Sequence, residues 1–257
     1  RLATNMAEQT GIKLSGRQVG RILVQKKFVY IWAKYSLEVK RDPAKREECK
    51  ARLANYKRVA EASPEKLQWW FWDESEFSLR VIRRKVWGRK GQRKKVSGQR
   101  RKGRVNVMGG VRFNDKKRWV EFISKGNSES FYEVLKIFYE EVKQEWVDQG
   151  NKAEEFEVKG PKLIIVLDNA SFHKKEDVVK KLAGEMPNIE LDFLPPYSPD
   201  YNLIELVWHS AKKYIANRVF KSIGQLEQLL HKLLNEGELV IHWNRKIKNK
   251  GDAVNAI

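Results

Sequence analysis

Residues 67–75 read LQWWFWDES, and residues 163–169 read LIIVLDN. Each stretch is mainly apolar up to an aspartate, Asp73 in the first, where Gln68 is the one polar residue before it, and Asp168 in the second. A strand that is apolar along its whole length is typical of the buried centre of a sheet, where both faces are covered. The two stretches therefore predict central strands that each end beside a carboxylate.

Segments on either side of these runs complete a sheet. The strand-like segments are RVNVMGGVRF at 104–113, RWVEFIS at 118–124 and IELDFLPPYSP at 189–199. Helical periodicity predicts helices at 130–146, 174–183, 203–219 and 223–235. Three strands in a meander, followed by alternating helices and strands, predict an α/β domain with a mixed sheet of about five strands flanked by helices.

The composition adds a strong positive charge to this domain. The chain has 257 residues, and 52 Lys and Arg against 33 Asp and Glu give a net charge of +19. A hydrophobic fraction of 41%, with nine Trp and eleven Phe, excludes a disordered basic tail. The charge indicates an anionic partner, most simply a nucleic acid. An acidic membrane surface is the alternative, but no run of about 18 apolar residues is present to span a bilayer.

Two further features bound the class of protein. The single cysteine, Cys49, excludes an internal disulfide and a multi-cysteine zinc site, and it is consistent with a reducing compartment. The chain begins at Arg1 without a signal-peptide pattern, which we interpret as a fragment or a processed chain.

A basic run at 80–104 concentrates much of the charge. It contains thirteen Lys or Arg and no acid, punctuated by four glycines. We interpret it as a twisted hairpin whose basic face contacts DNA phosphates, although a solvated loop would have the same composition. Trp87 could contact DNA or anchor the hairpin to the sheet. The candidate DNA contacts in the run are Arg83, Arg84, Lys85, Trp87, Arg89, Lys90, Arg93, Lys94, Lys95, Arg100, Arg101 and Lys102.

Residues 1–40 have the pattern of a partial winged helix-turn-helix. A short helix at 2–9 and a Thr-Gly turn precede a second helix, which begins with the capping-box pair Ser15 and Gln18. The extended FVYIW follows at 28–32. In a winged helix-turn-helix the second helix enters the major groove of DNA. The alternative interpretation of this segment is an ordinary pair of amphipathic helices. The candidate DNA contacts on its exposed face are Arg17, Gln18 and Arg21.

The two aspartates would meet at one edge of the sheet if their strands are neighbours, although either could simply begin a turn. Buried carboxylates repel each other, and a divalent cation such as Mg²⁺ relieves that repulsion. Two such ions about 4 Å apart can support phosphoryl transfer, and the second ion needs a third acid. Glu205, after a proline-rich loop, could supply it, but Asn202 and Glu205 also have the spacing of a helix cap.

Four blocks of the sequence, in this order, resemble a known family. They are FWDES at 71–75, KVWGRKGQ at 85–92, IIVLDNASFH at 164–173 and LPPYSPDYNLIELVW at 194–208. Together they are similar to the mariner-like superfamily of DDE transposases, and most of all to its bacterial insertion-sequence branch with the DDE superfamily endonuclease domain. The resemblance spans residues 67–219 and, more weakly, residues 1–35. The family usually has Pro where this chain has Leu203, which a first helical turn tolerates.

This resemblance implies a ribonuclease H-like catalytic domain at 64–257. Residues 41–63, which are charged and lack a broad apolar stripe, would form a linker helix behind the DNA-binding domain at 1–40. The metal-binding catalytic triad implied is Asp73, Asp168 and Glu205, with two Mg²⁺ or Mn²⁺ ions. The activity implied is cleavage at transposon ends and joining of the freed 3′-OH to target DNA.

The family also suggests partners and a location. We expect a homodimer on double-stranded DNA, at terminal inverted repeats and target sites, in the bacterial cytoplasm at the nucleoid and not at a membrane. The alternatives are another ribonuclease H-like nuclease and a decayed, non-enzymatic DNA-binding remnant. Three supporting residues have open roles: Asn169 orienting Asp168, His173 contacting a phosphate or carboxylate or lying in an ordinary loop, and Tyr197 stacking on a base or packing.

Overall fold

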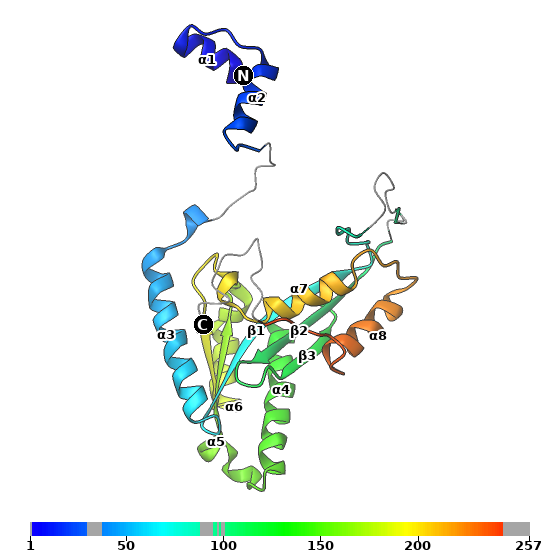
Figure 1. Cartoon of the computed structure of the whole chain (residues 1–257). Helices are drawn as coiled ribbons and strands as arrows, with labels where there is room; N and C mark the ends of the chain where they lie inside the picture. The colour runs from blue at the N-terminus through cyan, green and yellow to red at the C-terminus, as the bar shows by residue number, and fades with distance from the viewer. Residues whose placement is uncertain (1, 30–37, 88–94, 97, 99–100, 244–257) are drawn as a thin grey trace. The chain divides into compact units, whose positions relative to one another are not determined.

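The chain divides into two units, Arg1–Val39 and Lys40–Ile257 (Figure 1). The computed structural model describes residues 2–29, 38–87, 95–96, 98 and 101–243. The strands are β1 (Leu67–Ser78), β2 (Arg104–Arg112), β3 (Arg118–Ile123), β4 (Lys162–Leu167) and β5 (Ile189–Phe193). The α-helices are α1 (Leu2–Thr10), α2 (Gly16–Gln25), α3 (Pro43–Ala62), α4 (Ser128–Asp148), α5 (Phe156–Lys159), α6 (Glu176–Glu185), α7 (Glu205–Tyr214) and α8 (Ile223–Leu234). Short 3-10 helices are η1 (Glu38–Lys40), η2 (Ala153–Glu155), η3 (Ser171–Lys174) and η4 (Pro199–Tyr201).

One mixed sheet forms the centre of the second unit, with strand order β3-β2-β1-β4-β5. The first three strands are antiparallel neighbours, and β4 and β5 run parallel to β1. Helical crossovers connect the parallel strands, as their geometry requires. The predicted mixed five-stranded sheet flanked by helices is therefore confirmed. Within the described part of the chain, none of the helices has the length and apolarity needed to cross a bilayer.

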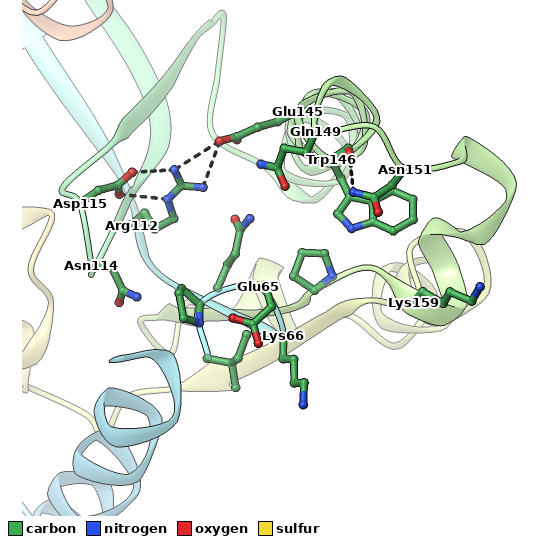
Figure 2. Close-up of a pocket in the computed structure, with 14 residues that line it drawn as sticks. Glu65, Lys66, Arg112, Asn114, Asp115, Glu145, Trp146, Gln149, Asn151 and Lys159 are labelled. Atoms are coloured by element: carbon green, nitrogen blue, oxygen red, sulfur yellow. Dashed lines mark hydrogen bonds and ion pairs between the residues drawn. The ribbon is translucent and has the colours of Figure 1, made fainter. Parts of the chain in front are cut away.

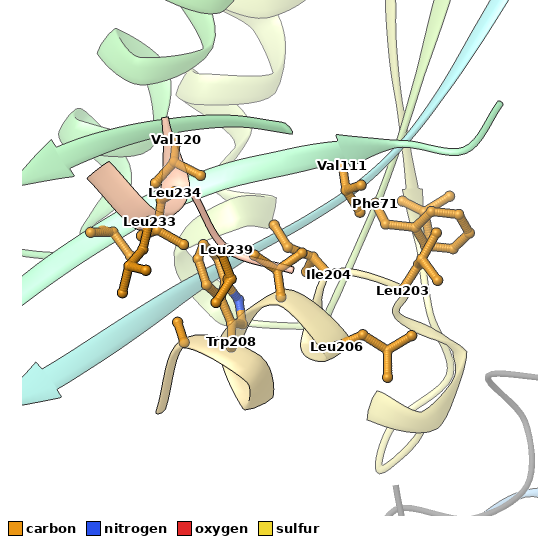
Figure 3. Packing of buried hydrophobic residues seen from close by; sticks show 14 of the residues in the cluster. Phe71, Val111, Val120, Leu203, Ile204, Leu206, Trp208, Leu233, Leu234 and Leu239 are labelled. Atoms are coloured by element: carbon orange, nitrogen blue, oxygen red, sulfur yellow. The ribbon is translucent and has the colours of Figure 1, made fainter. Parts of the chain in front are cut away.

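Successive side chains of β1 alternate between two cores. Trp69 and Phe71 belong to the core under α3, α7 and α8, whereas Trp70 and Trp72 belong to the core under α4 and α6. Because both faces are covered, the whole run is apolar. Figure 3 shows part of the first core, in which sheet residues pack against α7, α8 and the segments beside them: Phe71, Val111, Val120, Leu203, Ile204, Leu206, Trp208, Leu233, Leu234 and Leu239.

Gly110 in β2 allows the large rings of β1 to fit. It lies directly across from Trp72 in the antiparallel pair. A Cβ atom at this position would lie 2.5 Å from a ring carbon of Trp72, a distance that real contacts do not reach. The glycine is thus needed for space rather than for backbone freedom.

The helix expected as a linker is part of the second unit. α3 begins after Asp42, whose carboxylate accepts from the backbone N–H groups of Ala44 and Lys45. Three small or medium apolar residues, Cys49, Leu53 and Ala60, are buried in the core beside the sheet. The sequence suggested a linker helix because the apolar face of residues 41–63 is narrow. In the structure, the few apolar side chains of this face are enough to pack α3 against the core.

The first unit contains the predicted helix pair. Ser15 and Gln18 form the predicted capping box at the start of α2, and Val19 is the buried residue of that helix. Of the extended segment predicted at 28–32, the structure describes Phe28 and Val29. Neither residue lies in a strand, and both side chains are exposed. The rest of that strand lies outside the described residues.

The basic segment, here defined as residues 79–103, joins two antiparallel strands. Ser78 of β1 pairs with Arg104 of β2, so the segment leaves and re-enters the sheet at adjacent strands. Its described residues, 79–87, 95–96, 98 and 101–103, contain no strand, so the hairpin predicted within 80–104 is not found there. Like charges facing each other across a ladder are destabilising, which opposes strand pairing in so basic a segment.

Candidate active site

The two predicted aspartates lie side by side on neighbouring strands. β1 and β4 are parallel, with Phe71 paired to Val166. Two residues further along, Asp73 and Asp168 reach the same level. Since strand side chains alternate, Asp73 shares the face of Phe71, and Asp168 shares the face of Val166, which is the face covered by α3, α7 and α8.

The third predicted acid comes from the helix on that same face. Glu205 is the first residue of α7, and Leu206, Val207 and Trp208 hold the helix in the core. A cleft of about 440 Å³ is lined by all three acids, together with the loops after β4 and β5. The structure therefore brings Asp73, Asp168 and Glu205 to one cleft at the carboxyl end of β4.

Asn202 links the loop before α7 to strand β1 instead of capping the helix. Its amide donates to the backbone oxygen of Trp72, the residue before Asp73, at 2.8 Å. The residue that precedes α7 is Ile204, whose aliphatic side chain cannot cap a helix. The capping alternative for Glu205 is thus not what the structure shows. Asn202 fixes the start of α7 against the end of the apolar run of β1, which the sequence analysis did not foresee.

The two aspartates have opposite electrostatic environments. Burial, and then the nearby carboxylates of Glu74, Glu205 and Asp168, raise the pKa of Asp73 well above its usual range. By contrast, the neighbouring His173 lowers the pKa of Asp168 against the effect of burial. Asp73 therefore lies where negative charge is already in excess, and a cation in the cleft would stabilise its ionised form.

His173 is a buried bridge between two carboxylates. Its Nε2 lies 2.9 Å from Oε1 of Glu74, and its Nδ1 lies 3.2 Å from Oδ1 of Asp168. The ring is fully buried between Phe131 and Phe172. Burial alone would lower the pKa of His173, but Asp168 and Glu74 together raise it to about 9. Of the roles considered for His173, contact with a carboxylate is the one present.

Glu74 was missed because strand alternation points it away from Asp73. It shares the face of Trp72, where His173 packs against α4. The short helix η3, which follows Asp168, brings the His173 side chain back to Glu74 on strand β1. The pair of adjacent acids in FWDES was the available signal.

The other two supporting residues lie in the same cleft. Asn169 donates to the backbone oxygen of Leu194 and accepts from Lys174, so it joins two loops, while the backbone N–H of Ala170 holds the Asp168 carboxylate at 2.9 Å. Tyr197 is 43% exposed and has a positive φ of 59°, a strained conformation for a bulky residue. Tyr197 lines the cleft, and the Nζ atom of Lys40 lies 5.7 Å from the centre of its ring.

Two arginines hold the proline-rich loop that carries Tyr197. Arg46 of α3 forms an ion pair of 2.7 Å with Asp200, whose side chain is 1% exposed, and also donates to Ser198. Arg41 lies 3.4 Å from the same carboxylate and donates to the backbone oxygen of Tyr197. These contacts tie α3 to the loop that leads into α7. Their partners are far apart in the sequence, so no local pattern predicted them.

The cleft has the donor chemistry of a site for a hard divalent cation. Its three acids offer oxygen ligands only, as Mg²⁺ and Mn²⁺ prefer. The Oδ1 atom of Asn202 is buried there without a hydrogen-bond partner among the described residues. Across the described ranges, no group of three or more His, Cys, Asp or Glu side chains is already arranged as a metal site. The carboxylates share the cleft and would turn toward an ion.

The predicted DNA contacts fall into two described groups. In α2, Arg17, Gln18 and Arg21 are exposed as expected, but the side-chain oxygen of Gln18 accepts from Ser15 in the capping box. In the basic segment, Trp87 is fully exposed, so it does not anchor the segment to the sheet. The other exposed contacts in the described part are Arg83, Arg84, Lys85, Lys95 and Lys102, with Arg101 half-buried. Outside the described residues lie Arg89, Lys90, Arg93, Lys94 and Arg100.

A second cleft, of about 620 Å³, lies at the opposite end of the parallel strands (Figure 2). There Arg112 binds Asp115 through two hydrogen bonds of 3.0 and 2.6 Å and also contacts Glu145. These charges already neutralise one another, and open α/β sheets bind ligands at the carboxyl ends of their strands. The cleft with the three acids is therefore the candidate active site.

Comparisons with known proteins match both units of the chain. The family model described as DDE superfamily endonuclease matches residues 68–227, and one described as winged helix-turn helix matches residues 1–53. A curated relative from Sinorhizobium fredii, the uncharacterized protein y4pE/y4sA, is 41% identical over 69 residues, which cover 26% of this chain and 47% of that protein. The chain thus matches about half the length of this relative.

Solved structures share the fold at low identity. A pre-cleavage Mos1 transpososome matches with a TM-score of 0.64 and 17% identity, covering 91% of this chain and 67% of that one. A Mos1 mariner paired-end complex with Mn matches with a TM-score of 0.63 and 17% identity, covering 89% and 65%. The isolated catalytic domain of the Mos1 mariner transposase matches with a TM-score of 0.53 and 17% identity, covering 79% and 85%. The predicted ribonuclease H-like fold is confirmed by this likeness.

Proposed function

The chain belongs to the DDE superfamily of endonucleases, and on that premise we propose that it is a transposase that cuts DNA at transposon ends and joins the freed 3′-OH to target DNA. The observation that carries the proposal is the cleft shared by Asp73, Asp168 and Glu205. The three acids come from two strands and a helix far apart in the sequence, and they meet where this class of fold places its ligands.

Asp73, Asp168 and Glu205 would hold two Mg²⁺ or Mn²⁺ ions. When bound, such ions activate an attacking oxygen and stabilise a leaving one. Structures of Mos1 paired-end complexes with Mn and with Mg support the choice of metal. The raised pKa of Asp73 supports it too, because burial and the neighbouring carboxylates both disfavour its negative charge, and a cation would offset them.

The protein's own residues position these groups. The Oδ1 atom of Asp168 lies in ion-pair contact with Nδ1 of His173 and accepts a hydrogen bond from the backbone N–H of Ala170. Asn202 keeps the start of α7, and hence Glu205, in register with β1. The attacking oxygen belongs to water in the cutting step and to a DNA 3′-OH in the joining step. The reaction therefore uses no side-chain nucleophile and leaves no covalent bond between protein and DNA.

DNA would be held by cations on both units. The winged helix-turn-helix match includes Arg17 and Arg21, and the basic segment supplies cations beside the sheet that carries the acids. The positive surface offsets the repulsion between DNA phosphates and the acids in the cleft. Terminal inverted repeats and target DNA would be the substrates. A homodimer would bring two ends together, as the Mos1 paired-end complexes do, and action on chromosomal DNA would place it at the bacterial nucleoid.

An Asp168→Asn variant tests this proposal. We expect it to lose Mg²⁺-dependent nicking of supercoiled DNA, while its affinity for duplex DNA stays within a few-fold of the wild-type value. Urea unfolding would confirm that the variant is folded. Full nicking activity in this variant would exclude the assignment of the three acids, and the absence of nicking by wild-type protein on any DNA would favour a decayed, DNA-binding remnant.

A further inference from the structure

Asn217, in the connection between α7 and α8, forms hydrogen bonds with the start of the basic segment. Its backbone N–H donates to the oxygen of Ile82 at 2.8 Å. Its side chain accepts from the backbone N–H of Arg84 at 3.1 Å and donates to the oxygen of the same residue at 3.0 Å. The amide therefore pairs with Arg84 as a neighbouring strand would. Asn217 has a φ of 61°, a left-handed conformation that asparagine tolerates better than most residues.

The same connection also holds the end of the basic segment. The Nη1 atom of Arg101 donates to the backbone oxygen of Phe220 at 3.1 Å, and also to that of Lys221. Phe220 is buried in the core, so this anchor is fixed. Next to it, Gly103 has a φ of 128°, and a Cβ atom there would lie 2.9 Å from Ile223 at the start of α8. Both ends of the basic segment are thus built onto the α7–α8 connection.

The two joined segments carry cations and no acids. The sequence has no Asp or Glu from residue 77 to 114 or from residue 206 to 226. Arg218 and Lys221 on the connection are exposed, and the Arg218 guanidinium lies 4.1 Å above the centre of the Tyr214 ring. This contact presets the direction of Arg218. A cation held in place in advance loses less conformational entropy when it binds a phosphate.

We propose that Arg218 and Lys221 bind backbone phosphates of duplex DNA, on one surface with Arg83, Arg84 and Lys102, and that Asn217 is the positioning residue that holds this surface together. The inference rests on the proposed function for the identity of the ligand. It adds a DNA-contacting element, the α7–α8 connection, that lies outside both the basic segment and the helix-turn-helix.

Salt dependence of DNA binding tests the contacts. We would measure the anisotropy of a labelled duplex with full-length protein, without divalent metal, over a series of salt concentrations. Each lost phosphate contact makes the negative slope of log K against log salt shallower by about 0.9, so Arg218→Gln/Lys221→Gln should make it shallower by about 1.8. The matched control Lys136→Gln/Lys152→Gln removes the same charge from exposed positions elsewhere and should keep the wild-type slope.

Asn217→Gly tests the positioning role separately. Glycine keeps the left-handed backbone but removes both side-chain hydrogen bonds to Arg84. We expect the affinity to fall about tenfold, because two hydrogen bonds no longer order the surface before DNA binds, with the salt slope unchanged because the same phosphate contacts form in the complex. Unchanged affinity would exclude the positioning role, since a merely structural residue would alter the folded fraction and not the affinity of the folded protein.

The outcomes separate this inference from the proposed function. If the Arg218→Gln/Lys221→Gln slope equals that of the control while wild-type protein cuts DNA, the surface is wrong and the function stands. If wild-type protein never cuts DNA but the slopes change as expected, the surface stands and the function is wrong. The side chains of Arg218 and Lys221 are exposed, so Arg218→Gln/Lys221→Gln should keep the fold. This double variant therefore tests the DNA-binding surface even if Asn217→Gly does not fold.

Discussion

Replacement of Arg46 by methionine should destabilise the protein and weaken its chemistry together. Arg46 and Asp200 form an ion pair of 2.7 Å with side-chain exposures of 16% and 1%, and donation to Asp200 raises the pKa of Arg46. Breaking a buried pair costs about 3–5 kcal/mol, because the remaining charge stays buried. Arg41 still contacts Asp200, at 3.4 Å, so we expect about 3 kcal/mol, near the low end of that range.

A double-mutant cycle isolates the pair from general packing effects. In Arg46→Met/Asp200→Asn both charges are gone, and the cost should fall to about 1 kcal/mol. Since Asp200→Asn alone also leaves a charge unpaired, the two single variants together should cost more than the double variant by at least about 2 kcal/mol, which is the coupling. Urea unfolding of the wild type, both single variants and the double variant measures it. Additive effects, with coupling below about 0.5 kcal/mol, would refute the reasoning.

The same variants report on the loop that leads to Glu205. Because Asp200 anchors that loop, Arg46→Met should slow metal-dependent nicking at saturating DNA more than it weakens DNA binding. The rate should recover in part in Arg46→Lys, which keeps one charged donor. Equal rates in Arg46→Met and wild-type protein, measured where both are folded, would mean that the clamp on Asp200 is purely structural.

Three further outcomes follow from the cores and the site. Gly110→Ala should cost about 1–3 kcal/mol in urea unfolding, because its Cβ meets the Trp72 ring, whereas Gly184→Ala, with open space around it, should stabilise α6 by about 0.5–1 kcal/mol. The pKa of His173 is raised to about 9, so the stability that its charge contributes should be complete below pH 6.5 and should be lost as the pH rises through 9. The measurement is the difference in unfolding free energy between wild-type protein and His173→Gln, in the presence of a chelator. A difference that grows over this pH range would contradict the prediction. Mn²⁺ should raise the Tm of the wild type with increasing concentration and raise that of Glu205→Gln less; equal increases would place the metal elsewhere.

Two apolar runs in the sequence predicted the central strands of the fold, while the two aspartates that follow them had a turn as the alternative until the family resemblance was considered. Runs of this kind are typical of central strands, and the parallel pairing of β1 and β4 brings Asp73 and Asp168 to one level. Glu205 was ambiguous on local grounds, because cap spacing and a catalytic acid look alike in sequence. The resemblance of the surrounding block, and not its periodicity, selected it.

The remaining features depend on contacts between distant parts of the chain. The burial of α3 follows from three small contacts with a sheet that begins only after the helix ends. The Arg46–Asp200 pair and the Asn202–Trp72 hydrogen bond each join segments more than a hundred residues apart. Tertiary contacts of this kind leave no periodic signal, so the sequence predicted neither the packing of α3 on the sheet nor the hydrogen bond that Asn202 makes instead of capping α7.

Strand transfer from a pre-cut 3′ end tests the central claim most directly. Wild-type protein, given Mg²⁺, target DNA and a duplex of the element's terminal sequence with a free 3′-OH, should produce joined DNA. Asp73→Asn should remain folded, because it relieves repulsion among the cleft carboxylates, yet it should produce neither joined nor cut DNA. Joined products made by Asp73→Asn, or hydrolysis without joining by the wild type, would contradict the account of a transposase built on these three acids.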